Sequence, residues 1–329
     1  MPSAARANES TSVSDAPLSE AIVIPGEREG ARRGRRRRRA GNRQPAAGSP
    51  TAGYFFVALY VALLVCLGIA PAAYAIWLAF KTPGGVSVSN FVSTFHDFQF
   101  GPAFRHIFQF MAIWLVSQSV LVVTLALMVH DLGRRASGGL RFLFYLPGAL
   151  AGAASVVVWL FMLDPRTSPW APILHGFHFS ILANTVAPGH LPAIFALMAF
   201  WTGAGGWIVV MYGALNNIPD ELIEAAELDG CNAFQTAVRI KLPLIRKWVV
   251  YMLVLAFAAG SQLFVEPQIL GVASLGEVST QWSPNQLAYY LAFQQDKFNS
   301  AAAISVDLLV LGLLVAVLLV WRGRLFEVE

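Results

Sequence analysis

Long apolar segments separated by short polar ones make up the chain after about residue 49. Each of six such segments is long enough to cross a hydrocarbon core of roughly 30 Å, which takes about 20 helical residues. They are expected near Tyr54–Phe80, His106–His130, Phe142–Leu163, Leu191–Leu215, Trp248–Leu270 and Ala301–Trp321. A segment inside a bilayer must satisfy its own backbone polar groups, and a helix does so. The pattern therefore predicts an all-α, polytopic membrane protein with six transmembrane helices.

Composition supports this prediction. Of the 329 residues, 56% are hydrophobic and only 13% are charged, whereas a soluble protein carries roughly a quarter charged residues. No Asp, Glu, Lys or Arg lies between Arg166 and Asp220, or from Gln44 to Phe80. A water-soluble domain of this size needs charge over its whole surface, so that class is excluded.

The basic residues of the loops predict the orientation of the spans. Nine lie in alternate connections and at the C-terminal end: Arg134, Arg135, Arg141, Arg239, Lys241, Arg246, Lys247, Arg322 and Arg324. The other connections hold four: Lys81, Arg105, Arg166 and Lys297. Because Lys and Arg gather in cytoplasmic loops, we expect both termini in the cytoplasm and a multi-pass protein of the cell membrane.

Residues 1–49 form a basic tail that holds ten of the 23 Lys and Arg residues. With almost no aromatic residues it cannot bury a core, so we expect it to be a disordered cytoplasmic segment. Before a membrane span, an arginine run indicates a topology anchor with some contact to anionic lipid, rather than a nucleic-acid site. The tail is too long, and the apolar run after it too long, for a cleaved signal peptide.

One predicted inner loop, residues 216–247, differs from the others in length and pattern. A helix is expected to start at Pro219-Asp220, with acidic residues at its positive end. Gly230 allows a sharp turn, a second short helix is expected over about residues 233–240, and Pro243 ends it. Two short amphipathic helices hinged at a glycine form a compact knob suited to a groove on a partner protein.

This loop also carries a recognisable motif, made of the residues Glu224, Ala225, Ala226, Asp229, Gly230, Ile240, Leu242 and Pro243. The string resembles the EAA loop of binding-protein-dependent ABC importer permeases, and its spacing matches that loop residue for residue. The preceding Leu215–Pro219 and the FLFYLP of Phe142–Pro147 are similar to the carbohydrate-uptake branch, that of the maltose and glycerol-phosphate permeases. Cys231 stands where that family usually has Ala, and the Gly-Gly-Pro that often follows the fifth span is absent.

The resemblance implies a type I ABC importer permease fold over residues 50–329 and a non-catalytic transport subunit. Its partners would be a second permease subunit, a cytoplasmic ATPase dimer and an extracytoplasmic solute-binding protein. ATP and Mg would bind the ATPase, and Glu224 would lie at the contact through which ATP binding switches the permease. No GxxxxGK[ST] phosphate loop occurs in the sequence, in agreement with a separate ATPase.

The same resemblance, with a search for polar residues at bilayer depth, points to a solute pathway on the fourth and fifth spans. The candidate residues are Trp201, Thr202, Gly203, Gly206, Gly260, Ser261, Gln262 and Glu266. Amide and hydroxyl groups beside aromatic faces suit a sugar or a related polar solute. For each residue, plain helix packing is the alternative.

Other functions remain as alternatives. An ion-coupled secondary transporter would use Glu266 or Asp307 as its ion site. A membrane enzyme would need a catalytic motif, and neither HExxH nor GxSxG occurs. The outer-loop histidines His175, His178 and His190 do not have a zinc spacing, and the two cysteines, Cys66 and Cys231, predict neither a disulfide nor a metal site.

Overall fold

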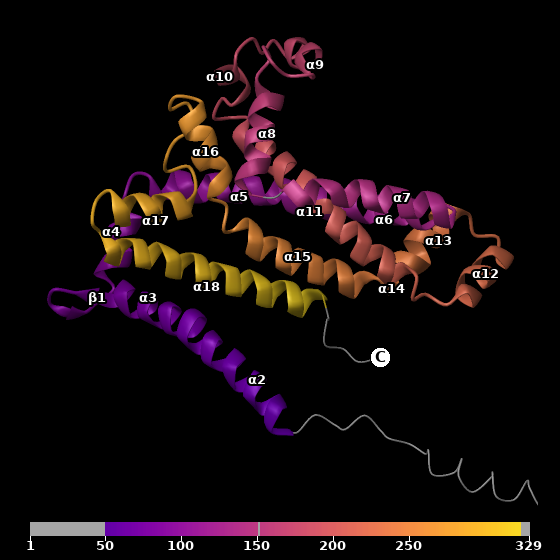
Figure 1. Cartoon of the computed structure of the whole chain (residues 1–329), viewed down its shortest axis with the longest axis horizontal. Helices are drawn as coiled ribbons and strands as arrows, with labels where there is room; N and C mark the ends of the chain where they lie inside the picture. Colours follow the sequence, from indigo (N-terminus) through magenta and orange to yellow (C-terminus); the bar gives the residue numbers. More distant parts are fainter. Residues whose placement is uncertain (1–49, 151, 324–329) are drawn as a thin grey trace, which may run out of the picture. The chain divides into compact units, whose positions relative to one another are not determined.

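A computed structural model describes residues 50–150 and 152–323, and it is helical over most of that length (Figure 1). The predicted basic tail, residues 1–49, lies outside the described residues. The chain divides into two units, Met1–Val65 and Cys66–Glu329, and each is described by itself. The described part of the first unit holds α2 (Pro50–Leu63) and the start of the π-helical η1 (Leu64–Ile69).

The second unit contains all the remaining elements. They are α3 (Ala70–Phe80), β1 (Lys81–Thr82), β2 (Gly85–Val86), α4 (Ser89–Phe95), α5 (Phe100–Ser117), η2 (Gln118–Val122), α6 (Val123–His130), α7 (Arg134–Tyr145), η3 (Leu146–Leu150), α8 (Ala153–Leu163), α9 (Ala171–Gly176), α10 (Leu182–Thr185), α11 (Leu191–Leu215), α12 (Asp220–Leu228), α13 (Ala233–Thr236), η4 (Ala237–Lys241), α14 (Leu242–Leu244), α15 (Arg246–Gly260), α16 (Val265–Ala273), α17 (Pro284–Phe293) and α18 (Phe298–Gly323). The strands β1 and β2 form one small antiparallel hairpin.

Four helical stretches are long and apolar enough to cross a membrane. They are Val57–Phe80, Phe100–His130, Leu191–Leu215 and Phe298–Arg322. Two bent pairs, Arg135–Leu150 with Ala153–Leu163 and Ala233–Leu244 with Arg246–Gly260, raise the number to six if each pair is one span. This arrangement is consistent with the six predicted spans.

The predicted bounds of the fifth span, Trp248–Leu270, are wrong. The helix α15 ends at Gly260, and α16 begins as a separate helix at Val265. The physical reason is Pro267, which has no N–H to donate to the carbonyl of Leu263 in a continuous helix. That carbonyl instead accepts a hydrogen bond from the Ser283 hydroxyl at 2.8 Å, while Pro267 occupies the first turn of α16, where no intrahelical donor is needed.

The predicted third span, Phe142–Leu163, is also interrupted. After α7, a 3₁₀ turn leads to Gly152, whose φ of +75° favours glycine, and α8 then starts in a new direction. The predicted second span starts earlier than expected, because the helix already begins at Phe100 rather than at His106. The hydrophobic pattern thus predicts where the membrane segments lie along the chain, but it does not predict the breaks in the third and fifth of them.

Within the second unit, two groups of connecting elements lie at opposite ends of the view, and the connection that holds α9 and α10 lies apart from both (Figure 1). The elements α12, α13 and α14 lie at the same end as the α6–α7 turn, and β1, α4 and α17 lie at the other. A hydrogen bond from Lys241 to Asp131 joins the first group, and one from Asn299 to the Lys81 carbonyl joins the second. The placement of these two groups is consistent with the alternation that the basic residues predict, and the connection after Arg166 lies at neither end.

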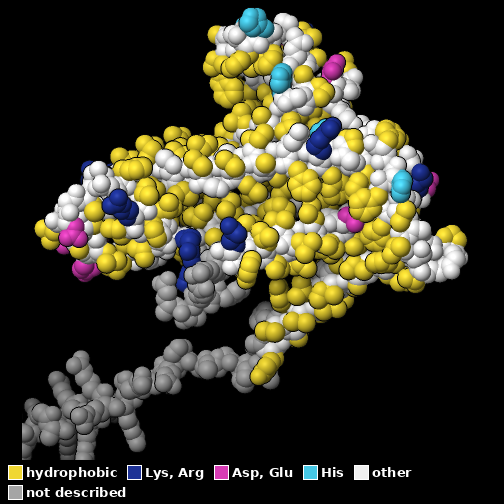
Figure 2. Space-filling model, turned by 180° about the vertical axis from the view of Figure 1, so that it is seen from behind, with side chains coloured by type: hydrophobic (Ala, Val, Ile, Leu, Met, Phe, Trp, Pro, Cys, Tyr) yellow, Lys and Arg dark blue, Asp and Glu magenta, His cyan; other side chains and the backbone are white. Residues whose placement is uncertain are grey.

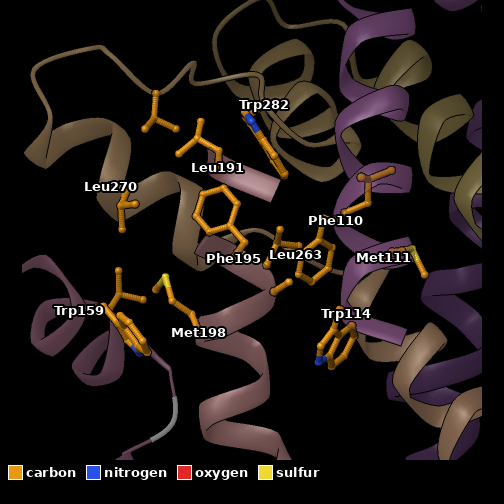
Figure 3. Close-up of a cluster of buried hydrophobic side chains, with 14 of the residues drawn as sticks. Phe110, Met111, Trp114, Trp159, Leu191, Phe195, Met198, Leu263, Leu270 and Trp282 are labelled. Atoms are coloured by element: carbon orange, nitrogen blue, oxygen red, sulfur yellow. The ribbon is translucent and has the colours of Figure 1, made fainter. Parts of the chain in front are cut away.

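Helix α11 lies at the centre of the packing and contacts α5, α6 and α7. The largest apolar cluster of the unit joins it to α5, α8 and the segment around α16 (Figure 3). There the ring of Phe195 packs edge-on against Trp282 with centroids 4.7 Å apart, and both side chains are buried. The cluster fixes how the spans are placed around α11.

Apolar side chains are spread widely over the face of the molecule that Figure 2 shows. On α18, Leu313, Leu314 and Val317 are each more than half exposed. A soluble monomer rarely exposes large contiguous apolar patches. Such a surface is instead compatible with contact to lipid along the spans.

Gly205 allows α11 to approach α7 closely. A Cβ atom added there would lie 2.0 Å from the carbonyl oxygen of Phe144 and 2.7 Å from the Cα of Tyr145. Both obstacles are backbone atoms, so a larger residue would have to push the helices apart. Small residues at such crossings are typical of membrane helices.

We expect Gly205→Ala to destabilise the protein by about 1–3 kcal/mol, the usual cost of overpacking. The matched control is Gly213→Ala on the same helix, where an added Cβ meets nothing within 4 Å. Thermal unfolding in detergent should show a lower midpoint for the first variant and a native midpoint for the second. Equal midpoints for Gly205→Ala and the native chain would contradict the close-packing assignment.

Candidate functional site

The predicted knob exists and is built from α12, α13, η4 and α14; we call residues 220–244 the coupling knob. Its first helix starts at Asp220, as expected, and carries Asp220 and Glu221 in its first turn. Glu224 is the fifth residue of this helix and lies just beyond its first turn. The second helix is shorter than predicted, because α13 ends at Thr236 and the chain continues as the π-helical η4.

The turn between the two helices depends on Gly230, whose φ is +81°. Its N–H donates to the carbonyl of Glu227 at 3.0 Å, and the N–H of Cys231 donates to Ala226 at 3.0 Å. This pair of bonds is the Schellman ending of a helix, in which a glycine takes the left-handed position. The motif residue Gly230 is therefore explained by backbone geometry.

The second helix is fixed at its start by a capping box. The side chain of Asn232 accepts from the N–H of Gln235, and the side chain of Gln235 accepts from the N–H of Asn232, both at 2.9 Å. Such reciprocal bonds satisfy two backbone donors that would otherwise be free. Sequence reasoning missed this cap, although an Asn three residues before a Gln was visible.

The motif residues divide between the inside and the outside of the coupling knob. Ala226 is buried, whereas Glu224, Ala225 and Asp229 are exposed. Two large apolar side chains are exposed as well, Leu228 at 90% and Phe234 at 75%. The coupling knob therefore presents carboxylates beside apolar side chains on its free surface.

The base of the coupling knob is anchored in the helix bundle. Ile245, which follows α14, is 1% exposed and belongs to an apolar cluster with residues of α6, α11 and α15. Leu242 packs on the same cluster, and Pro243 remains exposed. The motif's Leu-Pro pair thus lies where the coupling knob joins the fifth span. The helical segments Ala233–Leu244 and Arg246–Gly260 meet there at a bend of 67°.

The predicted pathway residues fall into two groups. In the first group, Gly203 and Gly260 both face the second span. A Cβ on Gly203 would lie 3.5 Å from the amide nitrogen of Gln118, and one on Gly260 would lie 2.3 Å from the ring of Trp114. The two residues of the second span are four apart, so they lie on one face of the helix.

Gln118 is a functional candidate that sequence reasoning missed. It is completely buried, and neither its amide nitrogen nor its amide oxygen has a hydrogen-bond partner among the described residues. It also begins the π-helical turn η2, and such turns are frequent at functional sites. A glutamine in the middle of an apolar span was the signal that could have found it.

Trp201 and Thr202 belong to the packing around this first group. The Trp201 ring meets Trp159 edge-on at 5.7 Å, and the Thr202 hydroxyl donates to the Met198 carbonyl at 3.1 Å. Gly206 has open space where a Cβ would stand. These residues lie on α11, next to one another as predicted.

The second group lies around Gln262, in the break between α15 and α16. Gln262 accepts from the side chain of Asn285 at 3.3 Å, and Asn285 also approaches the Ser261 carbonyl at 3.4 Å. Gln262 and Asn285 line a groove of about 450 Å³ with Phe264, Tyr289 and Phe293. Neither Asn285 nor Tyr289 was predicted from the sequence.

Of the two acidic residues that the sequence singled out, Glu266 lies outside its predicted span and Asp307 lies within the sixth span, as predicted. Glu266 lies on α16, outside the helices that could span a membrane, where burial raises the pKa of its carboxyl above the usual value. Asp307 lies within α18, and its Oδ2 has no partner among the described residues. No group of three His, Cys, Asp or Glu side chains that could hold a metal ion is found in residues 50–150 and 152–323.

Residues 85–325 match the model of the family described as "Binding-protein-dependent transport system inner membrane component". The chain therefore belongs to the inner-membrane permeases of binding-protein-dependent ABC importers. It is a multi-pass, non-catalytic transport subunit of the bacterial inner membrane.

Named relatives agree with this assignment. The chain is 30% identical over 287 residues to the sn-glycerol-3-phosphate transport system permease protein UgpA of Escherichia coli O6:K15:H31, covering 83% of this chain and 93% of the relative. It is 29% identical over 210 residues to UgpA of Salmonella typhimurium, covering 61% and 70%. The ion-coupled alternative with Glu266 or Asp307 as the ion site finds no support among these relatives.

Two solved structures show the same fold. A bacterial ABC transporter involved in the import of the acidic polysaccharide alginate matches with a TM-score of 0.70 at 20% identity, covering 84% of this chain and 96% of the other. A second structure, of the alginate transporter in complex with a periplasmic protein that carries an alginate pentasaccharide, also has a TM-score of 0.70, at 18% identity. At these identities the likeness concerns the fold alone.

We expect Asn232→Ala to loosen the coupling knob, because loss of a helix cap costs about 1 kcal/mol. Amide hydrogen exchange should become faster in α13 and remain native in α11. The control is Asn217→Ala, which removes a side-chain bond to the Gly213 carbonyl but no helix cap. Native exchange in α13 of Asn232→Ala would show that the capping box does not hold the second helix.

Proposed function

We propose that the coupling knob is the docking element for a cytoplasmic ATPase, with Glu224, Ala225, Ala226, Asp229, Gly230, Leu242 and Pro243 forming or supporting the contact. The observation that carries this proposal is the exposed surface of the knob. Leu228 and Phe234 are mostly exposed there, on the same surface that carries the charged residues Glu224 and Asp229. Large apolar side chains in such a place are typical of a protein contact.

The chemistry of this surface suits a groove on the partner. A short helix with an exposed apolar side can insert into an apolar groove of a partner protein. The carboxylates beside that side favour a partner whose groove has basic residues at its rim. The Schellman turn and the capping box keep the two helices in one arrangement. A rigid knob passes on a rigid-body motion, which a flexible loop would absorb.

The proposed cycle follows from this contact. The ATPase subunits bind ATP and Mg, and their closure draws the docked knobs together. The knob moves the inner ends of the spans, and the pathway opens alternately to the two sides. A second permease subunit completes the pore, and an extracytoplasmic solute-binding protein delivers the solute.

For the solute we propose an uncharged sugar or a related polar compound. Among the helices that could span a membrane, Lys and Arg occur only near the ends, such as Arg105 and Arg322. None of the proposed pathway residues is basic, and the one ionisable group among them is the carboxyl of Glu266. An anionic solute would lack a counter-charge from this chain in a medium of low dielectric constant.

The pathway proposal combines Trp201, Thr202, Gly203, Gly206 and Gly260 with the newly found Gln118. It also includes Ser261, Gln262 and Glu266 beside Asn285. Buried amides without partners can bind sugar hydroxyls when the solute arrives. Aromatic rings such as Trp201 offer an apolar face for the C–H side of a sugar.

For the docking contact, we expect Glu224→Ala to lower recovery of the ATPase at least about tenfold, the effect of losing about 1.4 kcal/mol at an interface. The chain would be expressed with the products of its genomic neighbours and purified in detergent through a tag on this subunit. ATPase subunits would be quantified by mass spectrometry.

The matched control is Glu277→Ala, which removes an exposed carboxylate from the connection between α16 and α17, outside the coupling knob. It should leave recovery of the ATPase native. If Glu224→Ala also retains the ATPase fully, Glu224 is not part of the contact. If no ATPase is recovered with the native chain, the proposed function fails.

For the pathway, we expect Trp201→Ala and Gln262→Ala each to lower uptake of a neutral sugar about tenfold, since a hydrogen bond or a stacking contact contributes about 1–1.5 kcal/mol. Uptake of radiolabelled maltose and of sn-glycerol 3-phosphate would be measured in cells that express the complete system. Maltose should be the better of these two probes.

The control for this experiment is Leu313→Ala, in a side chain that is 64% exposed on the outer face of α18. It should not change uptake. Native uptake in both pathway variants would remove these residues from the pathway. Preferred uptake of the phosphate ester would contradict the neutral-solute assignment.

A further inference from the structure

Lys241 is the most unusual charged residue in the described part of the coupling knob. It ends the π-helical η4 and is only 6% exposed. Its ammonium group donates to the carboxylate of Asp131 with an Nζ–Oδ1 distance of 2.5 Å. A lysine is almost never buried unless it is paired, because taking an ammonium out of water is costly.

The partner of Lys241 belongs to a different span. Asp131 is the residue at which α6 ends, so it marks the inner end of the second span, Phe100–His130. Its side chain is 46% exposed and therefore stays hydrated on one side. The ion pair thus joins the base of the coupling knob to the span that carries Gln118 and Trp114.

Further contacts extend from this ion pair to neighbouring helices. His130 has its Nδ1 3.5 Å from Asp131 and 3.4 Å from the Lys241 ammonium, and its ring lies 5.8 Å from that of Tyr212 on α11. The guanidinium of Arg141 on α7 stacks over the same tyrosine at 3.9 Å. A series of contacts therefore runs from Lys241 to the end of α6, from there to α11, and from α11 to α7.

A hollow lies directly beside the ion pair. It has a volume of about 210 Å³ and is lined by His130 and Lys241 on one side and by Asp220 and Ile223 of α12 on another. The start of the first knob helix is therefore not tightly packed against the ion pair. The directional contact between the coupling knob and the second span is the Lys241–Asp131 ion pair at the base of the knob.

We propose that Lys241 is a positioning residue that makes the second span follow the coupling knob during transport. The proposal rests on the proposed function, since it needs an ATPase that moves the knob. Apolar contacts at the base, such as that of Ile245, are non-directional and allow sliding. A buried ammonium held by one carboxylate fixes the register between η4 and α6, because separating the pair would leave the charge unpaired.

The consequence concerns the solute pathway. Gln118 and Trp114 contact the small residues Gly203 and Gly260 on the fourth and fifth spans. If the second span moves with the knob, these contacts change whenever the ATPase closes. The ion pair is then the link between ATP binding and rearrangement of the pathway.

Lys241→Met tests this role with little harm to folding. Methionine is unbranched and apolar, so it fills the buried site, and Asp131 remains hydrated. Asp131→Asn should be the less stable variant, because it leaves the ammonium buried without its charge partner. The double variant should regain thermal stability and still lack the link.

The readout is a distance change in the assembled complex, which needs no solute. Spin labels would be attached to cysteines at Leu132, after the second span, and at Trp321, near the end of α18; both side chains are exposed, at 44% and 78%. The native Cys66 and Cys231 would be replaced by Ser. The distance between the labels would be measured without nucleotide and after trapping with ATP and vanadate.

We expect the nucleotide-dependent change in the Lys241→Met complex to fall below about half of the native change, while trapped nucleotide remains native. The double variant should show the same loss at a restored unfolding midpoint. Arg166→Met, which removes the basic partner of an outer ion pair at 3.4 Å, is the matched control and should keep the native change.

A native distance change in Lys241→Met would overturn the proposal, as would a loss that is confined to the thermally unstable Asp131→Asn. A failure of the proposed function has a different signature. In that case no ATPase is recovered with the unaltered chain, and no nucleotide is trapped.

Discussion

The hydrocarbon core of the membrane is the constraint on which the rest of this structure depends. Inside it every backbone N–H and C=O needs a partner within the protein, so the spans are helices. Wherever a helix breaks, another polar group must form the hydrogen bond that the backbone N–H or C=O has lost. At the break after Gly260, the Ser283 hydroxyl satisfies the carbonyl that Pro267 cannot. The break in turn exposes Gln262 and creates the groove it shares with Asn285.

The same constraint explains where the chemistry of the protein can lie. Apart from Asp307 within α18, the charged groups of the helices that could span a membrane lie near the helix ends, and many other charged groups gather in the coupling knob. Glycine at three positions gives the helices their arrangement: Gly205 by close approach, Gly230 by its positive φ, and Gly260 by its contact with Trp114. Family membership and these local features agree, because a membrane permease needs tight packing between its spans.

Much of the coupling knob could be predicted from the sequence, since its determinants are local. Pro219, Gly230 and the acidic first turn act over a few residues, and the helix start at Asp220 is as expected. The neighbours of the proposed pathway residues were harder to predict. Gln118 and Asn285 lie far along the chain from Gly203 and Gln262, and only folding brings them together. Their roles therefore had no local signal beyond their polarity.

The sequence by itself determined the class of fold, the segments that could cross a membrane and the family. Hydrophobic length and loop charge set these features, and both are properties of single segments. Only the tertiary structure decided where the spans break and which helices meet. It also decided that Lys241 is buried against Asp131, because the two are 110 residues apart in the chain. From the sequence alone, a charged residue in a loop is expected to be solvated. Only the tertiary packing excludes water from Lys241.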